Sequence, residues 1–194
     1  MTKNQKVKAS EAFTTCLANN AMNRILGQQF FNRDTKVIAK EMIGKFLVRR
    51  LKGRIISAMI TETEAYDGFK DLASHARKGK TKRTEIMFGP PGHFYIYLCY
   101  GMYYMLNIST REALFPAAVL IRGITGMEGP GKLCKFLKID KKLNGLIANK
   151  KSGLWFEDRG IKIKKSKVKK TARVGVSYAG PIWSAKKLRF ILGN

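Results

Sequence analysis

The chain has 194 residues, of which 45% are hydrophobic, so it holds enough apolar material for one domain with a packed core. This composition excludes a disordered basic tail, although 38 lysine and arginine residues against 13 acidic residues give a formal net charge of +25. No apolar run is long enough to span a bilayer, and the polar start MTKNQKVKAS is not a secretory signal. We therefore expect a globular protein with no membrane partner.

The positive charge predicts the kind of partner. Such an excess favours a polyanion, and nucleic acid is preferred over a membrane because no amphipathic basic helix with a bulky apolar face stands out. The alternative is a generally solvated basic surface. Charge alone does not separate an enzyme from a ribosomal or architectural protein.

The cysteines and histidines indicate the compartment and bear on metal binding. Cys16, Cys99 and Cys134 are odd in number and far apart, which favours a reducing intracellular compartment. The two histidines, His75 and His93, complete none of the usual zinc spacings. We expect no metal site, and a location in the cytoplasm or nucleoid of a bacterium or in the nucleus of a eukaryote.

Two helices are expected near the N-terminus, after a frayed start over residues 1–10. Apolar residues keep a loose helical spacing before Gly27, at Phe13, Leu17, Met22 and Leu26. A second helix is expected over 35–43, with Asp34 as its N-cap and Gly44 at its end.

The next stretch, FLVRRLKGRIISAMITETEAY (46–66), predicts a β-hairpin that ends among acidic residues. Its two strand-like runs meet near Lys52-Gly53. In the second strand Glu62, Glu64 and Tyr66 share one face, because side chains in a strand alternate with a period of two.

Acidic residues cluster at the end of that second strand. Four of the 13 lie within ten positions, namely Glu62, Glu64, Asp67 and Asp71. Carboxylates oppose phosphate binding, so their presence beside the basic run 75–83 suggests chemistry. A strand-end Glu can activate water as a general base, an effect worth roughly a hundred to ten thousand fold. The alternative, which the residues leave open, is a salt-bridged pair that compensates Arg54 or the run 77–83.

A tyrosine-rich stretch, FYIYLCYGMYYMLNIS (94–109), follows the turn signal GPPG (89–92). It predicts one or two strands, with Tyr100-Gly101 placed where the chain can turn. One interpretation is a hydrophobic core hairpin. However, a buried tyrosine hydroxyl needs a partner, and aromatic faces beside positive charge suit stacking on nucleobases.

The second half of the chain contains a buried strand and a helix start. The run AAVLIRGI (117–124) predicts a buried strand, in which Arg122 is expected to face a carboxylate or the substrate. GPGK (129–132) opens a helix whose first turn, with Lys132, could bind an anion, although such a glycine-rich start is usually only a cap.

The remaining segments predict loops and strands. A lysine-rich loop is expected over 140–153, a strand from 154, an exposed basic edge strand or loop over 161–173, and strands with turns from 172 onward. We find no internal repeat and no linker, so one domain over 1–194 is expected.

Several of these segments, taken together, resemble the alkyladenine (3-methyladenine) DNA glycosylases. They occur in that family's order from about residue 30 to the end, and ETEAY followed by YGMYYMLNIS is the most specific part. The segments are TETEAY (61–66), His75, MFGPPGHFYIYLCYGMYYMLNIS (87–109), VLIR (119–122), GPGKLCKFL (129–137), RVGVSYAG (173–180) and LRF (188–190).

The resemblance implies both a fold and an activity. The implied fold is a compact α+β domain with a curved, mainly antiparallel sheet, flanking helices and a β-hairpin that enters the DNA minor groove. The implied enzyme acts as a monomer on double-stranded DNA and hydrolyses the N-glycosyl bond of alkylated or deaminated purines, leaving an abasic site. It uses no metal, no other cofactor and no covalent lysine adduct.

The resemblance also implies roles for individual residues. Glu64 is the general base that deprotonates the attacking water, and Arg122 with the backbone near Leu120 helps to hold that water. Tyr100 is the wedge that fills the gap left by the flipped nucleotide. The implied base pocket is formed by Tyr66, His75, Tyr97, Asn107 and Leu120, with Asn107 at the floor, where it crowds the amino group of normal guanine.

The basic run and the helix start supply the expected phosphate contacts, which are Arg77, Lys80, Arg83 and Lys132. One position departs from the family pattern, since Thr84 stands where an asparagine is expected after Arg83. The chain also has no long N-terminal extension and ends soon after LRF.

Two alternatives remain open at this point. In the first, the chain is a non-catalytic DNA- or RNA-binding protein whose tyrosines stack on bases and whose Glu64 is structural. In the second, GPGK marks a helix-hairpin-helix glycosylase. The strand-rich middle of the chain argues against the second alternative, because that fold is almost all helical.

Overall fold

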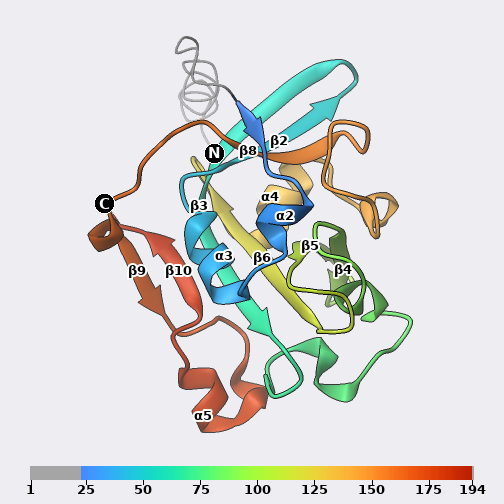
Figure 1. Cartoon of the computed structure of the whole chain (residues 1–194), viewed down its shortest axis with the longest axis vertical. Helices are drawn as coiled ribbons and strands as arrows, with labels where there is room; N and C mark the ends of the chain where they lie inside the picture. The colour runs from blue at the N-terminus through green and yellow to red at the C-terminus, as the bar shows by residue number, and fades with distance from the viewer. Residues whose placement is uncertain (1–22, 194) are drawn as a thin grey trace.

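The computed structural model describes residues 23–193, and its N-terminal part overturns one expectation (Figure 1). Most of the helix expected over residues 13–26 lies outside the described residues. Where the description begins, the chain forms strand β1 (Arg24–Ile25) instead of a helix. The backbone N–H of Leu26 then donates to the carbonyl of Phe156, so this segment belongs to a sheet edge.

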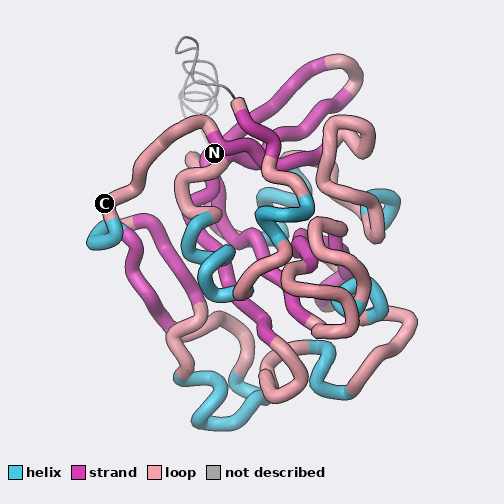
Figure 2. Tube along the Cα trace, in the orientation of Figure 1, coloured by secondary structure: helices cyan, strands magenta, loops and turns pink. Residues whose placement is uncertain are grey.

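A curved antiparallel sheet organises the described part of the chain (Figure 2). Its main strands follow the order β1-β8-β2-β3-β6-β5-β4, and β10 and β9 continue from the second half of β3. The strands are β2 (Phe46–Leu51), β3 (Arg54–Asp67), β4 (Phe94–Cys99), β5 (Tyr103–Ser109), β6 (Ala117–Ile124), β7 (Met127–Glu128), β8 (Leu154–Asp158), β9 (Val168–Thr171) and β10 (Arg189–Leu192).

Short helices flank this sheet, so the α+β prediction is confirmed. They are α2 (Gln28–Phe31), α3 (Thr35–Glu41), α4 (Pro130–Phe136) and α5 (Gly180–Ala185). Asp34 caps α3 as expected, since its carboxylate accepts hydrogen bonds from the backbone N–H groups of Lys36 and Val37. The helix ends at Glu41, two residues earlier than predicted.

Two tight turns form where the sequence placed them. The turn of the β2–β3 hairpin has positive φ at both Lys52 (46°) and Gly53 (79°), and the β4–β5 turn has the same feature at Tyr100 (49°) and Gly101 (68°). Positive φ at both central residues matches the strand twist, which is why glycine is favoured there. Both predicted hairpins are confirmed.

The C-terminal region contains one element that the sequence did not reveal. β9 is the expected basic edge strand, and β10 is part of the expected strand material. The sequence predicts turns where helix α5 lies, because its six residues GPIWSA are too few to show a helical repeat. Part of the predicted loop at 140–153 is a 3₁₀ turn, Lys141–Leu143.

Packing explains why a glycine stands in the first turn of the helix that begins at GPGK. A Cβ on Gly131 would lie 2.8 Å from the ring of Tyr103, so glycine is needed for α4 to approach β5. The helix lies against an antiparallel sheet, which excludes the helix-hairpin-helix alternative. No helix among the described residues combines the length and apolar character needed to cross a membrane.

The central strands present two different faces. One face enters the main core through residues that alternate along the strands, which are Phe94, Ile96, Leu106, Ile108, Val119, Ile121 and Ala65. Helix α3 covers this side in front of β3 and β6 (Figure 1), where the Thr63 hydroxyl donates to the Ala39 carbonyl. The residues between them, including Glu64, Tyr66, Tyr95 and Asn107, therefore point to the opposite face.

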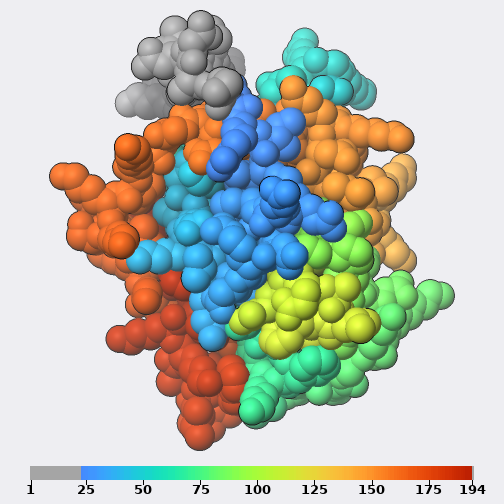
Figure 3. Space-filling model, in the orientation of Figure 1, coloured from blue at the N-terminus to red at the C-terminus, as the bar shows by residue number. Residues whose placement is uncertain are grey.

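The front of the molecule is closed by contacts between segments far apart in the sequence. The blue N-terminal segment lies against the yellow-green loop after β5 (Figure 3). Arg111 of that loop pairs with Asp34 at 2.8 Å and with Asp67 at 2.9 Å. This arrangement leaves the opposite face of the sheet for the candidate site.

Candidate functional site

Strand register brings the predicted site residues into one row. Across β4, β5, β6, β3 and β10, the paired positions are Tyr95, Asn107, Leu120, Glu64 and Arg189. Directly opposed residues in antiparallel strands project from the same face. The row therefore joins the tyrosine-rich hairpin to the acidic end of β3.

A narrow pocket opens on this face beside the row. Of the predicted base-pocket residues, Tyr66, His75, Tyr97 and Asn107 line it, and Leu120 does not. The other lining residues are Ala73, Ser74, Met87, Tyr95, Ala118 and Tyr178. The pocket has a volume of about 30 Å³, which holds one or two water molecules and is smaller than a typical ligand pocket.

Glu64 lies behind this pocket, fully buried. Its Oε1 accepts a hydrogen bond from the Val174 N–H at 2.8 Å, and its Oε2 accepts one from the Tyr66 hydroxyl at 2.8 Å. Burial raises the pKa of Glu64, while Arg122 and these two hydrogen bonds limit the rise. A buried carboxylate with an elevated pKa and neighbouring cations is suited to accept a proton.

Arg122 bridges the two glutamates of β3, as the sequence suggested for an arginine in a buried strand. Its Nε lies 2.7 Å from Glu62 Oε1 and 3.4 Å from Glu64 Oε1. Arg189 of β10 also donates to Glu62, at 2.5 Å. Glu62 thus holds the two arginines, and Arg122 remains within reach of Glu64.

The acidic cluster is paired, and Arg122 is the one partner that the sequence indicated. The alternative that these acids compensate Arg54 or the run 77–83 is wrong, since none of the four pairs with those residues within residues 23–193. Glu62 binds Arg122 and Arg189, Asp67 binds Arg111, and Asp71 binds Arg173. All four arginines lie distant in sequence, so local charge spacing could not identify them.

The opposite wall of the pocket is aromatic and carries the only histidine in it. His75 begins the 3₁₀ turn η1 (His75–Lys78), and its Nδ1 lies 2.9 Å from the Tyr95 hydroxyl. The rings of His75 and Tyr97 meet edge to face with centroids 4.7 Å apart. Burial, reinforced by the positive charges of Arg83 and Arg77, lowers the pKa of His75 to about 4, so the imidazole is neutral near pH 7.

Asn107 is fixed at the pocket by its backbone neighbours. Its Nδ2 donates to the carbonyl of Tyr95 at 3.0 Å and to that of Met105 at 3.3 Å. A side-chain amide held by two carbonyls is a rigid group. Leu120 sits next to it in register, buried between Asn107 and Glu64.

The turn at Tyr100 carries exposed apolar side chains. Tyr100 itself is 89% exposed, and Leu98, Met102 and Tyr103 around it are also exposed. Large apolar side chains gathered at a hairpin tip indicate a contact surface.

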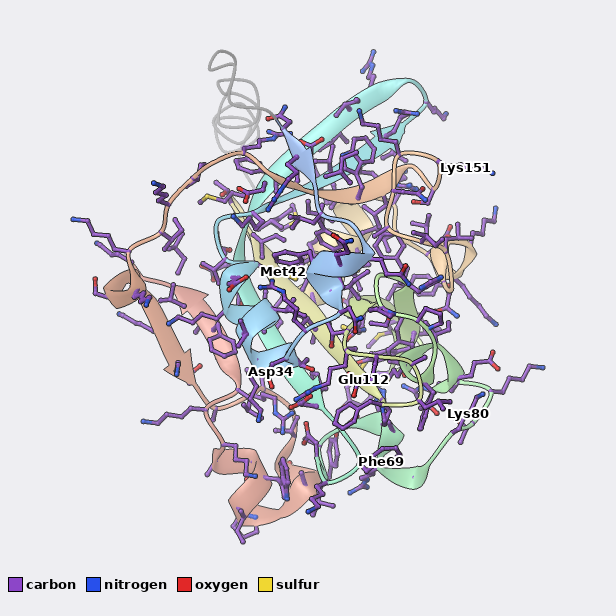
Figure 4. All side chains as sticks on the ribbon, in the orientation of Figure 1. Asp34, Met42, Phe69, Lys80, Glu112 and Lys151 are labelled. Carbon is purple, nitrogen blue, oxygen red and sulfur yellow. The ribbon has the colours of Figure 1, made fainter. Side chains whose placement is uncertain are left out.

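The predicted phosphate contacts lie on the surface. Arg77, Lys80, Arg83 and Lys132 are exposed and form no ion pair with any carboxylate of residues 23–193. Lys80 lies at the periphery of the molecule (Figure 4). The two arginines of this set stack on tyrosines that line the pocket. The Cζ atom of Arg77 lies 5.3 Å from the ring centroid of Tyr178, and that of Arg83 lies 4.9 Å from the ring centroid of Tyr97.

Thr84, the departure from the family pattern, stabilises the loop that carries Lys80 and Arg83. It is buried, and its hydroxyl donates to the Gly79 carbonyl at 3.1 Å and accepts from the Thr81 N–H at 2.9 Å. The Thr84 side chain therefore joins Gly79 and Thr81 by hydrogen bonds and stabilises the loop 79–84.

Sequence reasoning missed two groups of site residues. Tyr95 and Tyr178 line the pocket, and Val174, Arg173 and Asp71 organise its acidic side. The motif RVGVSYAG (173–180) contains three of these residues, Arg173, Val174 and Tyr178, and was a signal that the C-terminal segment reaches the site. Within the described part of the chain, no cluster of three His, Cys, Asp or Glu residues could hold a metal ion.

Comparisons with known proteins show the family of this chain. The family model for methylpurine-DNA glycosylase (MPG) matches residues 29–194. A protein of Rickettsia peacockii, named as a candidate 3-methyladenine DNA glycosylase, is 46% identical over 165 residues, covering 80% of this chain and 86% of that protein. One of the same name from Methanocella arvoryzae is 42% identical over 176 residues, with the same two coverages. The resemblance in the sequence motifs is confirmed, and this chain belongs to the methylpurine-DNA glycosylase family, whose members hydrolyse N-glycosyl bonds in DNA.

Proposed function

We propose that this chain is a monofunctional glycosylase of base excision repair. It rotates an alkylated or deaminated purine out of duplex DNA and hydrolyses the N-glycosyl bond with a water activated by Glu64. The substrate class comprises 3-methyladenine, 7-methylguanine, hypoxanthine and ethenoadenine. The single observation that carries the proposal is a buried carboxylate held by Arg122 and Tyr66 directly behind an aromatic pocket.

The first step is access to the base. Tyr100 enters the minor groove and fills the gap left by the rotated nucleotide, at a cost of about a few kcal/mol for unstacking. A damaged or mispaired base costs less to rotate, which begins the selection. The exposed ring at a hairpin tip supports this role, and the unpaired Arg77, Lys80, Arg83 and Lys132 contact phosphates.

The second step is binding in the pocket. The purine stacks between Tyr66 on one side and His75 with Tyr97 on the other, and a cationic alkylated base gains further attraction from the ring faces. Asn107 forms the floor and excludes the amino group of guanine. Because the pocket encloses only about 30 Å³, the Tyr178 segment moves aside when the base enters. One hydrogen bond, from the Tyr178 hydroxyl to the Ala73 carbonyl, closes that rim.

The third step is hydrolysis. Ionised Glu64 accepts a proton from water, which adds to C1′ of the deoxyribose as the bond to the purine nitrogen breaks. The same negative charge stabilises the oxocarbenium-like sugar. The bonding electrons leave with the purine: a cationic alkylated base departs as a neutral molecule, and a neutral base such as hypoxanthine takes up a proton from solvent, while Glu64 later returns its proton to solvent. Arg122 and the backbone near Leu120 position the water, and Arg122 keeps Glu64 ionised.

The reaction ends at an abasic site. Water is the nucleophile, so no Schiff base with lysine forms and the DNA strand is not cut. The proposed enzyme acts inside the cell as a monomer built of one domain over residues 1–194, and these steps require no cofactor.

The test compares wild type with Glu64→Gln on duplexes that carry one hypoxanthine or one ethenoadenine, and on methylated DNA. Abasic sites are detected by alkaline cleavage, and binding to the same duplexes is measured in parallel. Wild type is expected to release base, and the variant is expected to lose roughly a hundred to ten thousand fold in rate while it still binds. Binding without release by wild type on all substrates would instead establish the alternative, a non-catalytic nucleic-acid-binding protein.

A further inference from the structure

One ion pair at the site is more deeply buried than any other in the described residues. The side chains of Arg173 and Asp71 are both 0% exposed. The guanidinium donates to both carboxylate oxygens, from Nη1 at 2.6 Å and from Nη2 at 2.8 Å. Such a bidentate pair fixes both the position and the plane of the arginine.

This ion pair joins the three segments that surround Glu64. Arg173 Nη1 also donates to the Ala65 carbonyl on β3, and its Cζ lies 4.7 Å over the ring of Tyr66. Asp71 in turn accepts hydrogen bonds from the backbone N–H groups of Asp67 and Ala73, so it shapes the loop that leads to the pocket. The pair therefore sets β3, the loop 68–74 and the segment 172–178 relative to one another.

Both hydrogen bonds to Glu64 depend on groups next to this pair. Val174, whose N–H donates to Oε1, is the residue directly after Arg173, and Tyr66, which donates to Oε2, is the residue on which Arg173 stacks. A shift of the guanidinium would displace the donors on both carboxylate oxygens at once.

Stability alone gives a poor reason for such a pair. Two charges taken out of water lose much solvation, and apolar residues of similar volume often stabilise a core as well or better. Arg173 Nε, moreover, is buried without a hydrogen-bond partner among the described residues, a further cost. An ion pair that costs stability and lies next to both hydrogen-bond donors of Glu64 is better explained by a role in positioning those donors than by a role in folding.

We propose that Arg173, fixed by Asp71, is a positioning residue for catalysis: it holds the Val174 N–H and the Tyr66 hydroxyl on Glu64 and so keeps this carboxylate oriented and ionised. The inference rests on the proposed function, in which Glu64 is the general base.

Several charged and titratable groups face Glu64 and bear on its ionisation. They are Arg122 on β6, Tyr66 on β3 and Arg173 on the C-terminal segment, while Arg189 on β10 faces Glu62. Loss of the Val174 hydrogen bond and of the Arg173 charge removes two influences that lower the pKa of Glu64. The acidic limb of the pH–rate profile should then move to higher pH.

The experiment uses the full chain, a hypoxanthine duplex and single-turnover base release from pH 5 to pH 9. Two changes are compared with wild type, Arg173→Lys and the double variant Asp71→Leu with Arg173→Met, which leaves no unpaired buried charge. Arg159→Met is the matched control, because Arg159 pairs with Glu157 at 2.8 Å and stacks on Phe46 at 4.3 Å, on strands that lie away from the pocket. DNA affinity and urea unfolding are measured for each protein.

We expect both site variants to lose roughly a hundredfold in the rate of base release, with DNA affinity unchanged. Their acidic limb should move to higher pH, and Arg159→Met should keep the wild-type rate and profile. A folded double variant, or a Lys variant, with wild-type rate and pH profile would overturn the inference. If the double variant does not fold, Arg173→Lys alone decides. Wild type without any base release would contradict the proposed function instead, so the two failures are distinguishable.

Discussion

The two sides of the pocket are built from different kinds of interaction. On the β3 side, Glu64, Arg122 and the Asp71–Arg173 pair are buried or nearly so, and each charge has a partner. On the hairpin side, Arg77 and Arg83 are exposed, stack on Tyr178 and Tyr97, and have no carboxylate partner among residues 23–193. Tyr100 at the tip is almost fully exposed.

This difference indicates a division of labour. Buried, mutually paired charges are costly to disturb, and they hold reacting groups in place before substrate arrives. Exposed cations and aromatic rings add little to folding, but they are free to meet phosphates and bases. Changes on the β3 side should therefore affect stability and catalysis together, and changes to the exposed side chains of the hairpin side should affect mainly DNA binding.

The largest effect is expected from Arg122→Met, which removes a paired charge from the β3 side of the pocket. It leaves Glu64 without its nearest cation and Glu62 with Arg189 only, so the protein should lose about 3 kcal/mol of unfolding free energy. The pKa of Glu64 should rise further, and base release near pH 7 should fall. Urea unfolding and the pH–rate profile measure the two effects. Arg122→Lys keeps the charge, so its stability and rate should lie between those of wild type and Arg122→Met. Wild-type stability and rate in Arg122→Met would contradict the proposed difference between the two sides of the pocket.

A smaller effect, confined to binding, is expected from Tyr100→Ala. Loss of one stacked ring should weaken binding to a hypoxanthine duplex by about 1–3 kcal/mol. The unfolding free energy should change by less than about 0.5 kcal/mol, because the side chain is exposed and alanine keeps the same Cβ at this positive φ. Fluorescence anisotropy and urea unfolding test both points, with Tyr100→Phe as the control. A large loss of stability would show that the hairpin tip supports the fold.

The smallest effect concerns pH and His75. Its pKa is about 4 in the folded protein against an ordinary value of 6.5, so the unfolded chain binds a proton first as the pH falls. The stability contribution is complete above about pH 6.5 and is lost as the pH falls toward 4. Urea unfolding at pH 7, 5.5 and 4.5 should show a steeper decline for wild type than for His75→Asn. Equal slopes would mean that the pKa of His75 is the same in the folded and the unfolded chain.

Much of the fold could be predicted from local signals. The Asp34 cap, the Lys52-Gly53 turn and the Tyr100-Gly101 turn all formed, because capping and tight turns depend on residues within a few positions. The N-terminal strand β1 and helix α5 were not predicted. The former depends on pairing with β8, over a hundred positions away, and the latter is too short to show a periodic pattern.

The sequence by itself determined which side chains share a strand face. Alternation placed Glu62, Glu64 and Tyr66 together, and the family motifs pointed to the same residues as a site. Only the tertiary structure decided how these faces meet. Register across non-adjacent strands aligned Asn107, Leu120 and Glu64, and a partner 102 positions away gave Asp71 its arginine. Periodicity describes neighbours along one strand, whereas register and buried ion pairs depend on how distant segments pack, so no local pattern contains them.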